Sequence, residues 1–432
     1  RCDLRIAGMG AALQGNLSYG LDNGLARGQM SGGISDLGAL NEIAGGTLSG
    51  TALIDLVMDG SAAGGQDVAL RLAMAGLAFD DMTVADARMA VDVSDVLNQP
   101  SLSLQASVDN AAAAGEQIDR LLIQANGPLD SLAMSLDAKG ASWDLATRAH
   151  GNLVAGVDVE VSALSGSIDD RPLEAKGPFH FSMAGNDIAL SGLELTAAGG
   201  TLVADIRHLN TDTTADVTLT GLPIEFLSHW SGALDLKGTL EGFLKLDANQ
   251  QSARAEIELK GLGIGSKLDP DGDIADIHAT AKWDGSAIDG AVNVAGIDGV
   301  AANIQVDWPV EHDVSGGLPG SPQDAPFSVA LTVKGGLAEI WDRFPIGDQS
   351  LAGNLDVSVT ASGTLASPRI DGTATVAGGR YENFTTGTII EDMALQTQAS
   401  SDGALELTAS ASDGHEGELS IKGSASFVQD QG

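Results

Sequence analysis

The chain has 432 residues, 59 of them acidic and 22 basic, which gives a formal net charge of -37. This charge argues against nucleic acid as a partner, because a phosphate backbone attracts clustered Lys and Arg, and against adhesion to anionic lipid headgroups. The single cysteine, Cys2, excludes a disulfide within the chain. No apolar run reaches the ~18 residues of a membrane-spanning helix, and the chain opens at Arg1 without a signal peptide. We therefore interpret it as a segment of a longer polypeptide.

Apolar and polar residues alternate with a period of two along nearly the whole chain, which predicts β-strands. Each alternating segment has one apolar and one polar face, as in an antiparallel sheet. Turn-forming pairs such as Asn126-Gly127, Asp284-Gly285 and Asp371-Gly372 separate the segments. In chain order, the clearest segments are 68–74, 102–108, 157–162, 255–260, 327–334, 355–359 and 405–407. We expect an all-β protein.

The number of strands limits the architecture. One strand and turn every ~10 to 13 residues gives roughly 35 strands, whereas open sheets seldom exceed ~10 strands without curling or splitting. The chain must therefore form sandwiches, wind into a solenoid, or curl into one long trough. All three need one buried face per strand, so periodicity alone does not choose among them.

Three short segments have helical instead of alternating spacing. In the most regular one, Leu337, Ile340, Trp341 and Phe344 share one helix face. A second runs from Leu222 to Trp230, with Pro223 at its first helical position and Phe226, Leu227 and Trp230 on one side. A third, weaker one runs from Ile34 to Ile43. Such short helices must pack against the sheet, either as caps of a sheet edge or as covers of an apolar groove.

The chain matches itself at an offset of 115 residues. Gly238 falls on Gly353, Ser252 on Ser367 and Gly263 on Gly378, so a helix, a Gly-led strand and a second strand recur in the same order. A weaker copy at 34–74 aligns residues 46–50 with 238–242. We expect a quasi-repetitive β-array with segments 1–216, 217–330 and 331–432. The Pro- and Gly-rich stretch 309–326 is interpreted as an inserted surface loop, with a domain boundary as the alternative.

The sequence contains no catalytic motif. Its seven histidines lack metal-ligand spacing, and no nucleophile elbow or phosphate-binding loop is present. The best metal candidate is the acidic run Asp269–Asp273, but Ile274 and Thr280 stand where a helix-loop-helix calcium site needs Gly and Glu. An acidic hairpin turn is the simpler interpretation. We expect neither enzymatic activity nor a cofactor.

One stretch of sequence resembles a known family. It begins with Gly353-Asn354-Leu355, continues through Ser367-Pro368-Arg369, and ends with Gly378-Gly379-Arg380-Tyr381. Together with Lys237–Gly242, this pattern resembles the translocation and assembly module subunit TamB, a family grouped with the AsmA-like and bridge-like lipid-transfer proteins. The resemblance is specific over 217–427, suggestive at 34–74, and compositional between them.

The resemblance implies a β-sheet rolled into a long U-shaped trough that crosses the bacterial periplasm. The trough's apolar interior would carry phospholipid acyl chains, and the family is also linked to outer-membrane protein assembly with a barrel partner, TamA. The inner-membrane anchor and the domain that meets the partner would lie outside this segment.

The apolar positions of the alternating segments are then expected to line the groove, and the helical segments to cover it. The predicted lining residues are Val68, Leu70, Leu72, Met74, Leu102, Leu104, Val157, Val159, Val161, Val217, Leu219, Leu234, Leu236, Leu240, Ile257, Leu259, Val329, Leu331, Val333, Leu355, Val357, Val359, Leu405 and Leu407. The predicted covering residues are Phe226, Leu227, Trp230, Leu337, Ile340, Trp341 and Phe344.

A second hypothesis comes from another class of protein, an acidic extracellular β-solenoid or adhesin-like repeat that binds calcium. Its length, low cysteine content and abundant Gly and Asp fit this class. Such a protein should carry tandem Asp-rich motifs, whereas this chain has one imperfect candidate.

Overall fold

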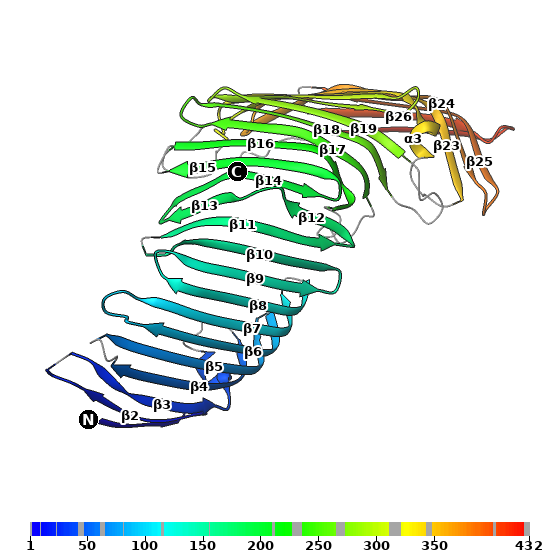
Figure 1. Cartoon of the computed structure of the whole chain (residues 1–432). Helices are drawn as coiled ribbons and strands as arrows, with labels where there is room; N and C mark the ends of the chain where they lie inside the picture. The colour runs from blue at the N-terminus through cyan, green and yellow to red at the C-terminus, as the bar shows by residue number, and fades with distance from the viewer. Residues whose placement is uncertain are drawn as a thin grey trace. The chain divides into compact units, whose positions relative to one another are not determined.

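The computed structural model describes residues 2–8, 10–22, 24–41, 47–60, 65–80, 82–113, 116–154, 156–209, 212–226, 236–264, 273–310, 321–342, 348–400 and 403–426. The chain forms two compact units, Arg1–Ala198 and Gly199–Gly432. Both consist almost entirely of antiparallel strands (Figure 1), so the all-β prediction is confirmed.

In the first unit, each strand from β1 to β10 pairs with the next one along the chain. Strand β11 pairs with both β12 and β13, and both of these pair with β14. A short 3-10 helix, η1 (Leu37–Leu40), precedes β4. The strands are β1 (Cys2–Gly8), β2 (Ala11–Tyr19), β3 (Ala26–Ile34), β4 (Leu48–Gly60), β5 (Gln66–Phe79), β6 (Met82–Ser94), β7 (Ser101–Ala113), β8 (Glu116–Pro128), β9 (Leu132–Gly140), β10 (Trp143–Asn152), β11 (Val157–Ile168), β12 (Arg171–Ala175), β13 (Phe179–Ala184) and β14 (Asp187–Ala197).

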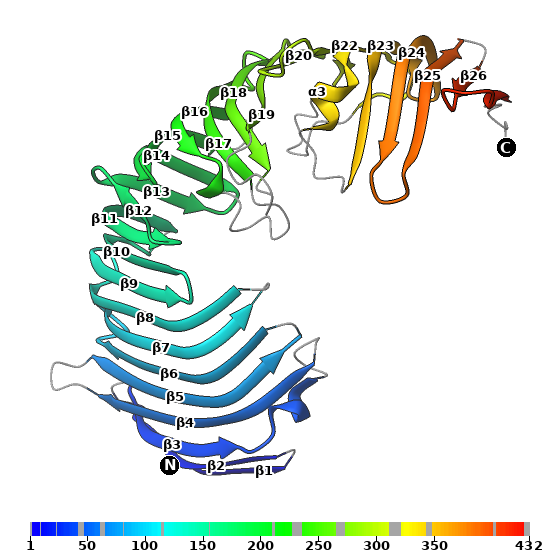
Figure 2. The ribbon, with the colours of Figure 1, turned by 90° about the vertical axis from the view of Figure 1, so that its right-hand side faces the viewer.

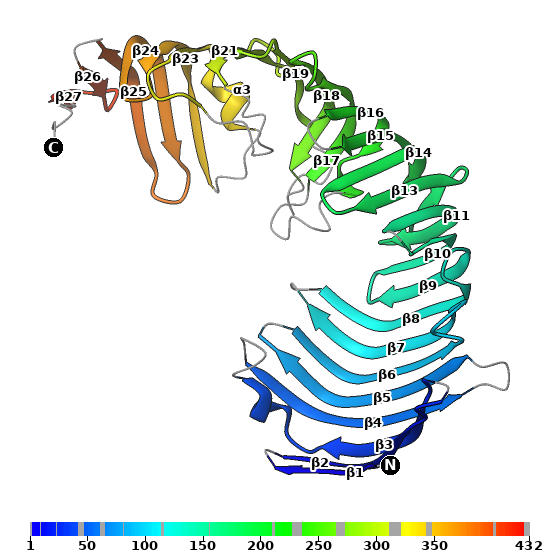
Figure 3. The same cartoon turned by 90° about the vertical axis from the view of Figure 1, so that its left-hand side faces the viewer.

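In the second unit, every strand pairs with the next one along the chain, as β23, β24 and β25 illustrate (Figure 3). One helix, α3 (Leu337–Trp341), connects β22 to β23. The strands are β15 (Gly200–Leu209), β16 (Asp212–Pro223), β17 (Leu236–Asp247), β18 (Ser252–Ile264), β19 (Asp273–Trp283), β20 (Ala287–Ala295), β21 (Ala301–Pro309), β22 (Pro326–Gly336), β23 (Gln349–Thr364), β24 (Ser367–Asn383), β25 (Thr388–Ala399), β26 (Ala404–Ser412) and β27 (Glu418–Ser426).

The sheet of the first unit is bent along its strands. Strands β4 to β8 run as arcs that form a trough (Figure 2). Each strand contacts mainly the strands with which it pairs, so the sheet is a single layer. The single curled layer agrees with the trough and not with a sandwich.

One β-bulge recurs three times, each time in the hairpin that follows a helical segment. The register shifts between Ser49 and Thr51, between Lys237 and Thr239, and between Ala352 and Asn354. At each shift the partner strand has one extra residue. A glycine of the partner strand has a φ of +61, +59 or +58° there (Gly76, Gly261 and Gly378, in chain order). The glycine opposite has a φ of +116, +136 or +138° (Gly50, Gly238 and Gly353). A bulge of this kind bends a strand and increases its twist, so the repeat seen in the sequence is a device that curves the sheet.

The bulges correct the alignment of the repeat. The structural counterpart of Gly238 in the first unit is Gly50, whereas the sequence comparison placed Gly46 there. The counterpart of Gly378 is Gly261, whereas the offset of 115 placed Gly263 there. Strands β23 and β24 extend further beyond the bulge than β17 and β18 do, and a constant offset cannot follow that difference.

Two predicted turns are wrong. Asn126-Gly127 lies inside β8 and Asp371-Gly372 inside β24, where Gly372 pairs with Val359. A Cβ on Gly372 would meet the backbone oxygen of Ser358, so the glycine serves a close approach between strands. Strands such as β24 are therefore long, and the described part of the chain contains 27 strands instead of the roughly 35 expected from the ordinary spacing.

Three other segments that interrupt the alternating pattern can be compared with their predictions. Asp284-Gly285 forms the turn between β19 and β20, as predicted. Strands β21 and β22 flank the stretch 309–326 and pair with each other, which favours an insertion within one unit over a domain boundary. Ile34 ends β3, and the helix that follows it begins only at Leu37.

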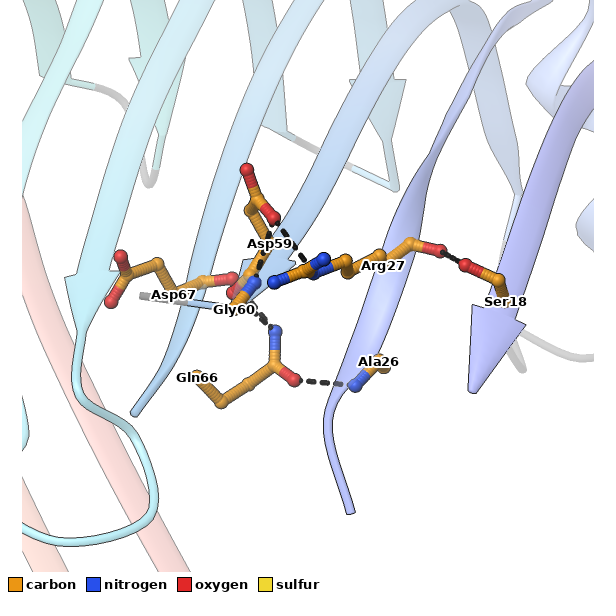
Figure 4. Close-up of polar contacts among 7 residues, drawn as sticks. All are labelled: Ser18, Ala26, Arg27, Asp59, Gly60, Gln66 and Asp67. Atoms are coloured by element: carbon orange, nitrogen blue, oxygen red, sulfur yellow. Dashed lines mark hydrogen bonds and ion pairs between the residues drawn. The ribbon is translucent and has the colours of Figure 1, made fainter. Parts of the chain in front are cut away.

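A buried glutamine joins three strands at one end of the trough. Gln66, only 8% exposed, accepts a hydrogen bond from the backbone of Ala26 (2.7 Å) and donates to the carbonyls of Asp59 (2.8 Å) and Asp67 (3.1 Å) (Figure 4). Arg27 lies 3.3 Å from Asp59 in the same corner. Because the side chain of Gln66 is buried and these hydrogen bonds are partly buried, its amide fixes the β4–β5 hairpin to the start of β3.

Candidate functional site

The register places the predicted lining residues of the first unit on one face of its sheet. Leu70 of β5 lies opposite Leu56 and Val91, Val91 lies opposite Leu104, and the same row continues to Ala125. Paired residues in an antiparallel sheet point to the same side. This apolar face of the first unit includes Val68, Leu70, Leu72, Met74, Leu102, Leu104, Val157, Val159 and Val161.

The second unit has an equivalent apolar face. Val217 pairs with Leu244, Leu331 with Val359, and Val333 with Val357. The register connects these rows through every strand from β15 to β27. The predicted residues on this face are Val217, Leu219, Leu240, Ile257, Leu259, Val329, Leu331, Val333, Leu355, Val357, Val359, Leu405 and Leu407.

The two faces of each sheet differ in exposure. Along β4, Ile54, Leu56 and Met58 are half-buried, whereas the intervening Asp55 and Val57 are exposed. Val159 on the apolar face is 8% exposed, although none of the described segments forms a second layer over it. Side chains on the inner side of a bent sheet converge and shield one another, so this difference assigns the apolar face to the inside of the bend.

Aromatic rings that the sequence analysis did not select also lie on the apolar faces. In the first unit, Phe179 and Phe181 pair with Val161 and Val159. In the second unit, Trp283 pairs with Ile288, and Ile288 pairs with Trp308. The ring of Trp308 lies 5.1 Å from that of Phe327. The signal in the sequence was their own alternation, such as Phe179-His180-Phe181, which continues the period of two.

The opposite faces carry cross-strand ion pairs. Examples are Arg71–Asp92 (2.8 Å), Lys176–Glu194 (2.7 Å) and Lys334–Asp356 (3.1 Å). Such exposed pairs contribute about 0–1 kcal/mol each. They keep the polar faces hydrated. Any binding of uncharged hydrocarbon chains is therefore expected on the apolar faces.

Hydrogen bonds shift the pKa of three exposed groups. The carboxylates of Glu258 and Glu241 raise the pKa of Lys260. The backbone amide of Ser286 donates to Asp284 and lowers the pKa of that carboxyl. The amides of His415 and Gly417 lower the pKa of Asp413 in the same way. Both aspartates close turns, so these shifts reflect turn structure and not acid-base catalysis.

The predicted covering helices are described only in part. Helix α3 contains Leu337, Ile340 and Trp341, and Trp341 donates a hydrogen bond to the carbonyl of Gln349 on β23 (3.2 Å). The predicted start of the helix at Leu222 is wrong, because Leu222 and Pro223 end β16.

Phe226 is helical and buried. Five of the residues selected from the sequence cannot be placed. Leu227, Trp230, Leu234 and Phe344 lie outside the described residues, as does the side chain of Leu236.

The described residues hold no cluster of His, Cys, Asp or Glu suited to a metal ion. Most of the acidic run Asp269–Asp273 lies outside them, so the calcium hypothesis stays a prediction. No helix in the described part of the chain is both long and apolar enough to span a membrane. A comparison with protein-family models and one with curated proteins found no match to this chain.

Proposed function

We propose that this protein carries phospholipids through the periplasm between the inner and outer bacterial membranes, with the acyl chains lying on its two apolar faces. The observation that carries the proposal is the register, which aligns apolar side chains strand after strand on one side of a single layer. Soluble proteins rarely leave a large contiguous apolar surface in water. A chain of methylene groups fits it without specific geometry, at about 25 cal/mol per Å² of apolar surface covered.

The acidic polar faces support the same proposal. They carry the ion pairs and keep that side of the sheet in water, which leaves the apolar faces for acyl chains. Periplasmic location, an inner-membrane anchor outside this chain, a TamA-type partner and a role in outer-membrane protein assembly follow from the resemblance to TamB, and we propose them on that basis.

Photo-crosslinking tests which face holds lipid. A photoreactive amino acid at Leu331 should crosslink to phospholipid in cells, whereas one at the adjacent Thr332, on the polar face, should not. Val359 lies opposite Leu331 in β23, so Val359→Glu should reduce crosslinking at Leu331 because a carboxylate against an acyl chain is costly to desolvate. Ser358→Glu, one residue away on the polar face, is the matched control.

Mass spectrometry of the purified protein provides the second measurement. Phospholipid should co-purify with the wild-type chain and decrease with Val359→Glu. Equal crosslinking at Leu331 and Thr332, or a protein free of lipid whose folding requires calcium, would reject the lipid groove and favour the adhesin-like alternative.

A further inference from the structure

A hollow of ≈ 850 Å³ lies across β3 to β7 of the first unit, and most of the residues around it belong to the polar face. Two rows of the register cross it. One row consists of Gly33, Leu53, Ala73, Arg88 and Ser107, and the other of Ser31, Asp55, Arg71, Ala90 and Gln105. The other residues around it, Gly32, Ile54, Leu72 and Met89, alternate with these rows, so their side chains point to the apolar face and the hollow opens on the polar face.

The residues around the hollow are both apolar and polar. Ala73 and Ala90 are small residues that leave space between larger neighbours, and Leu53 is 65% exposed beside them. Arg71, Arg88 and Gln105 contribute charged and polar atoms. An apolar surface with a few convergent polar groups is the usual character of a small-molecule site, and its volume falls within the ~300–1,000 Å³ of such sites.

The two arginines differ in what they bind. Arg71 forms two 2.8 Å contacts with the carboxylate of Asp92 and donates to the carbonyls of Leu70 and Val91, so its charge is neutralised. Arg88 makes no hydrogen bond or ion pair with the residues that the structure describes, and its cross-strand neighbours are Ala73 and Ser107. It is the cation of the hollow that remains available for a ligand.

The acidic residues nearest in the register do not neutralise Arg88. Asp55 lines the hollow opposite Arg71, and Asp86 and Asp109 face each other one row away on the polar face. None of the three forms an ion pair with Arg88. The chain has a net charge of -37, so an anion can bind only where a cation is close. Charges more than ~8 Å from the anion are largely screened at physiological ionic strength.

We propose that this hollow binds a small amphiphile with one anionic group, a carboxylate or a phosphate monoester, on a short apolar chain. The planar guanidinium of Arg88 would take the anion through two parallel N–H donors. The chain would lie over Ala73, Ala90 and Leu53. This site is independent of the proposed phospholipid groove, since it uses the other face of the sheet.

Calorimetric titration of the full chain with octanoate, octyl phosphate and octan-1-ol tests the proposal. We expect one site for each anion, with octan-1-ol binding at least about tenfold more weakly, as loss of a charge-assisted hydrogen bond implies. Comparing octanoate with octyl phosphate tells which of the two anionic groups the site prefers.

Three variants locate the site. Arg88→Gln should weaken both anions at least about tenfold, and Ala73→Phe should do the same by filling the hollow. Arg148→Gln on β10 removes the same charge from the same polar face, away from the hollow, and should bind like the wild type. Unchanged thermal unfolding shows that each variant is folded.

Unchanged affinity in Arg88→Gln, equal binding of octan-1-ol and octanoate, or an equal loss in Arg148→Gln would overturn the proposal. The phospholipid that co-purifies with Arg88→Gln separates the two sites. If it is unchanged while octanoate binding is lost, the hollow and the groove are distinct; if neither ligand binds the wild type, both proposals fail.

Discussion

The recurring bulge makes a quantitative prediction at Gly353. Its φ is +138°, and a Cβ there would lie 2.9 Å from Cα of Gly379 and 3.3 Å from both the nitrogen of Gly379 and Cγ1 of Val376. A non-glycine residue in such a conformation costs about 1–3 kcal/mol. The backbone contact adds to this cost, because 2.9 Å is well inside the ~3.5–4.0 Å optimum for two carbons. We expect Gly353→Ala to lower the free energy of unfolding by about 2–4 kcal/mol.

Gly378, on the opposite strand of the same bulge, is the matched comparison. Its φ is +58°, and a Cβ there meets nothing within 4 Å. Alanine in this left-handed conformation costs about 1–2 kcal/mol, so Gly378→Ala should destabilise the protein less than Gly353→Ala. The substitutions are chemically identical and differ only in what the new methyl group contacts.

Hydrogen-exchange mass spectrometry of the full chain is the assay, because it reports the opening free energy of individual segments. Peptides from β23 and β24 should lose protection in both variants, and more in Gly353→Ala. Peptides from the first unit serve as the internal reference. Equal protection in the two variants, or a larger loss in Gly378→Ala, would refute the steric reasoning about the bulge.

Three further substitutions have defined outcomes. Gln66→Ala removes three partly buried hydrogen bonds to the backbone of Ala26, Asp59 and Asp67. Urea denaturation should therefore show a loss of about 1–3 kcal/mol, and an unchanged midpoint would contradict the role of Gln66. The backbone amide of Ser286 stabilises the carboxylate form of Asp284 and so lowers its pKa. The wild type should therefore melt at a higher temperature than Asp284→Ala near neutral pH. This difference in melting temperature should vanish as the pH falls through the lowered pKa. Trp341→Phe keeps an aromatic ring, although a smaller one, and loses the bond to the carbonyl of Gln349. We expect a loss of about 1 kcal/mol in the same urea assay.

The alternating pattern was sufficient to assign the faces of the strands. Leu331, Val333, Val357 and Val359 were selected only because they alternate with polar residues, and the register brings them together on one face. A period of two specifies sides without knowledge of partners, so every selected residue whose side chain the structure describes within a strand lies on an apolar face. Whether that face holds lipid is the part that still requires the crosslinking experiment.

The helical segments were harder to predict because competing signals overlap in a few residues. Pro223 suits the first turn of a helix and equally the end of an edge strand, and here it ends β16. The sequence showed the repeat correctly at Gly238 and Gly353. Its alignment at Gly261 and Gly378 depended on the lengths of the strands. Those lengths follow from pairing, which a local pattern does not contain.

The amino-acid sequence by itself determined that this protein is an acidic all-β chain whose strands each have one apolar side. Both properties follow from composition and from the period of two, which are local. Only the tertiary structure decided that the strands form single curled layers, that three glycine pairs bend them, and that Arg88 faces a hollow between Ala73 and Ser107. These features depend on which strand lies beside which and in what register, and the hydrogen bonds between neighbouring strands set that arrangement.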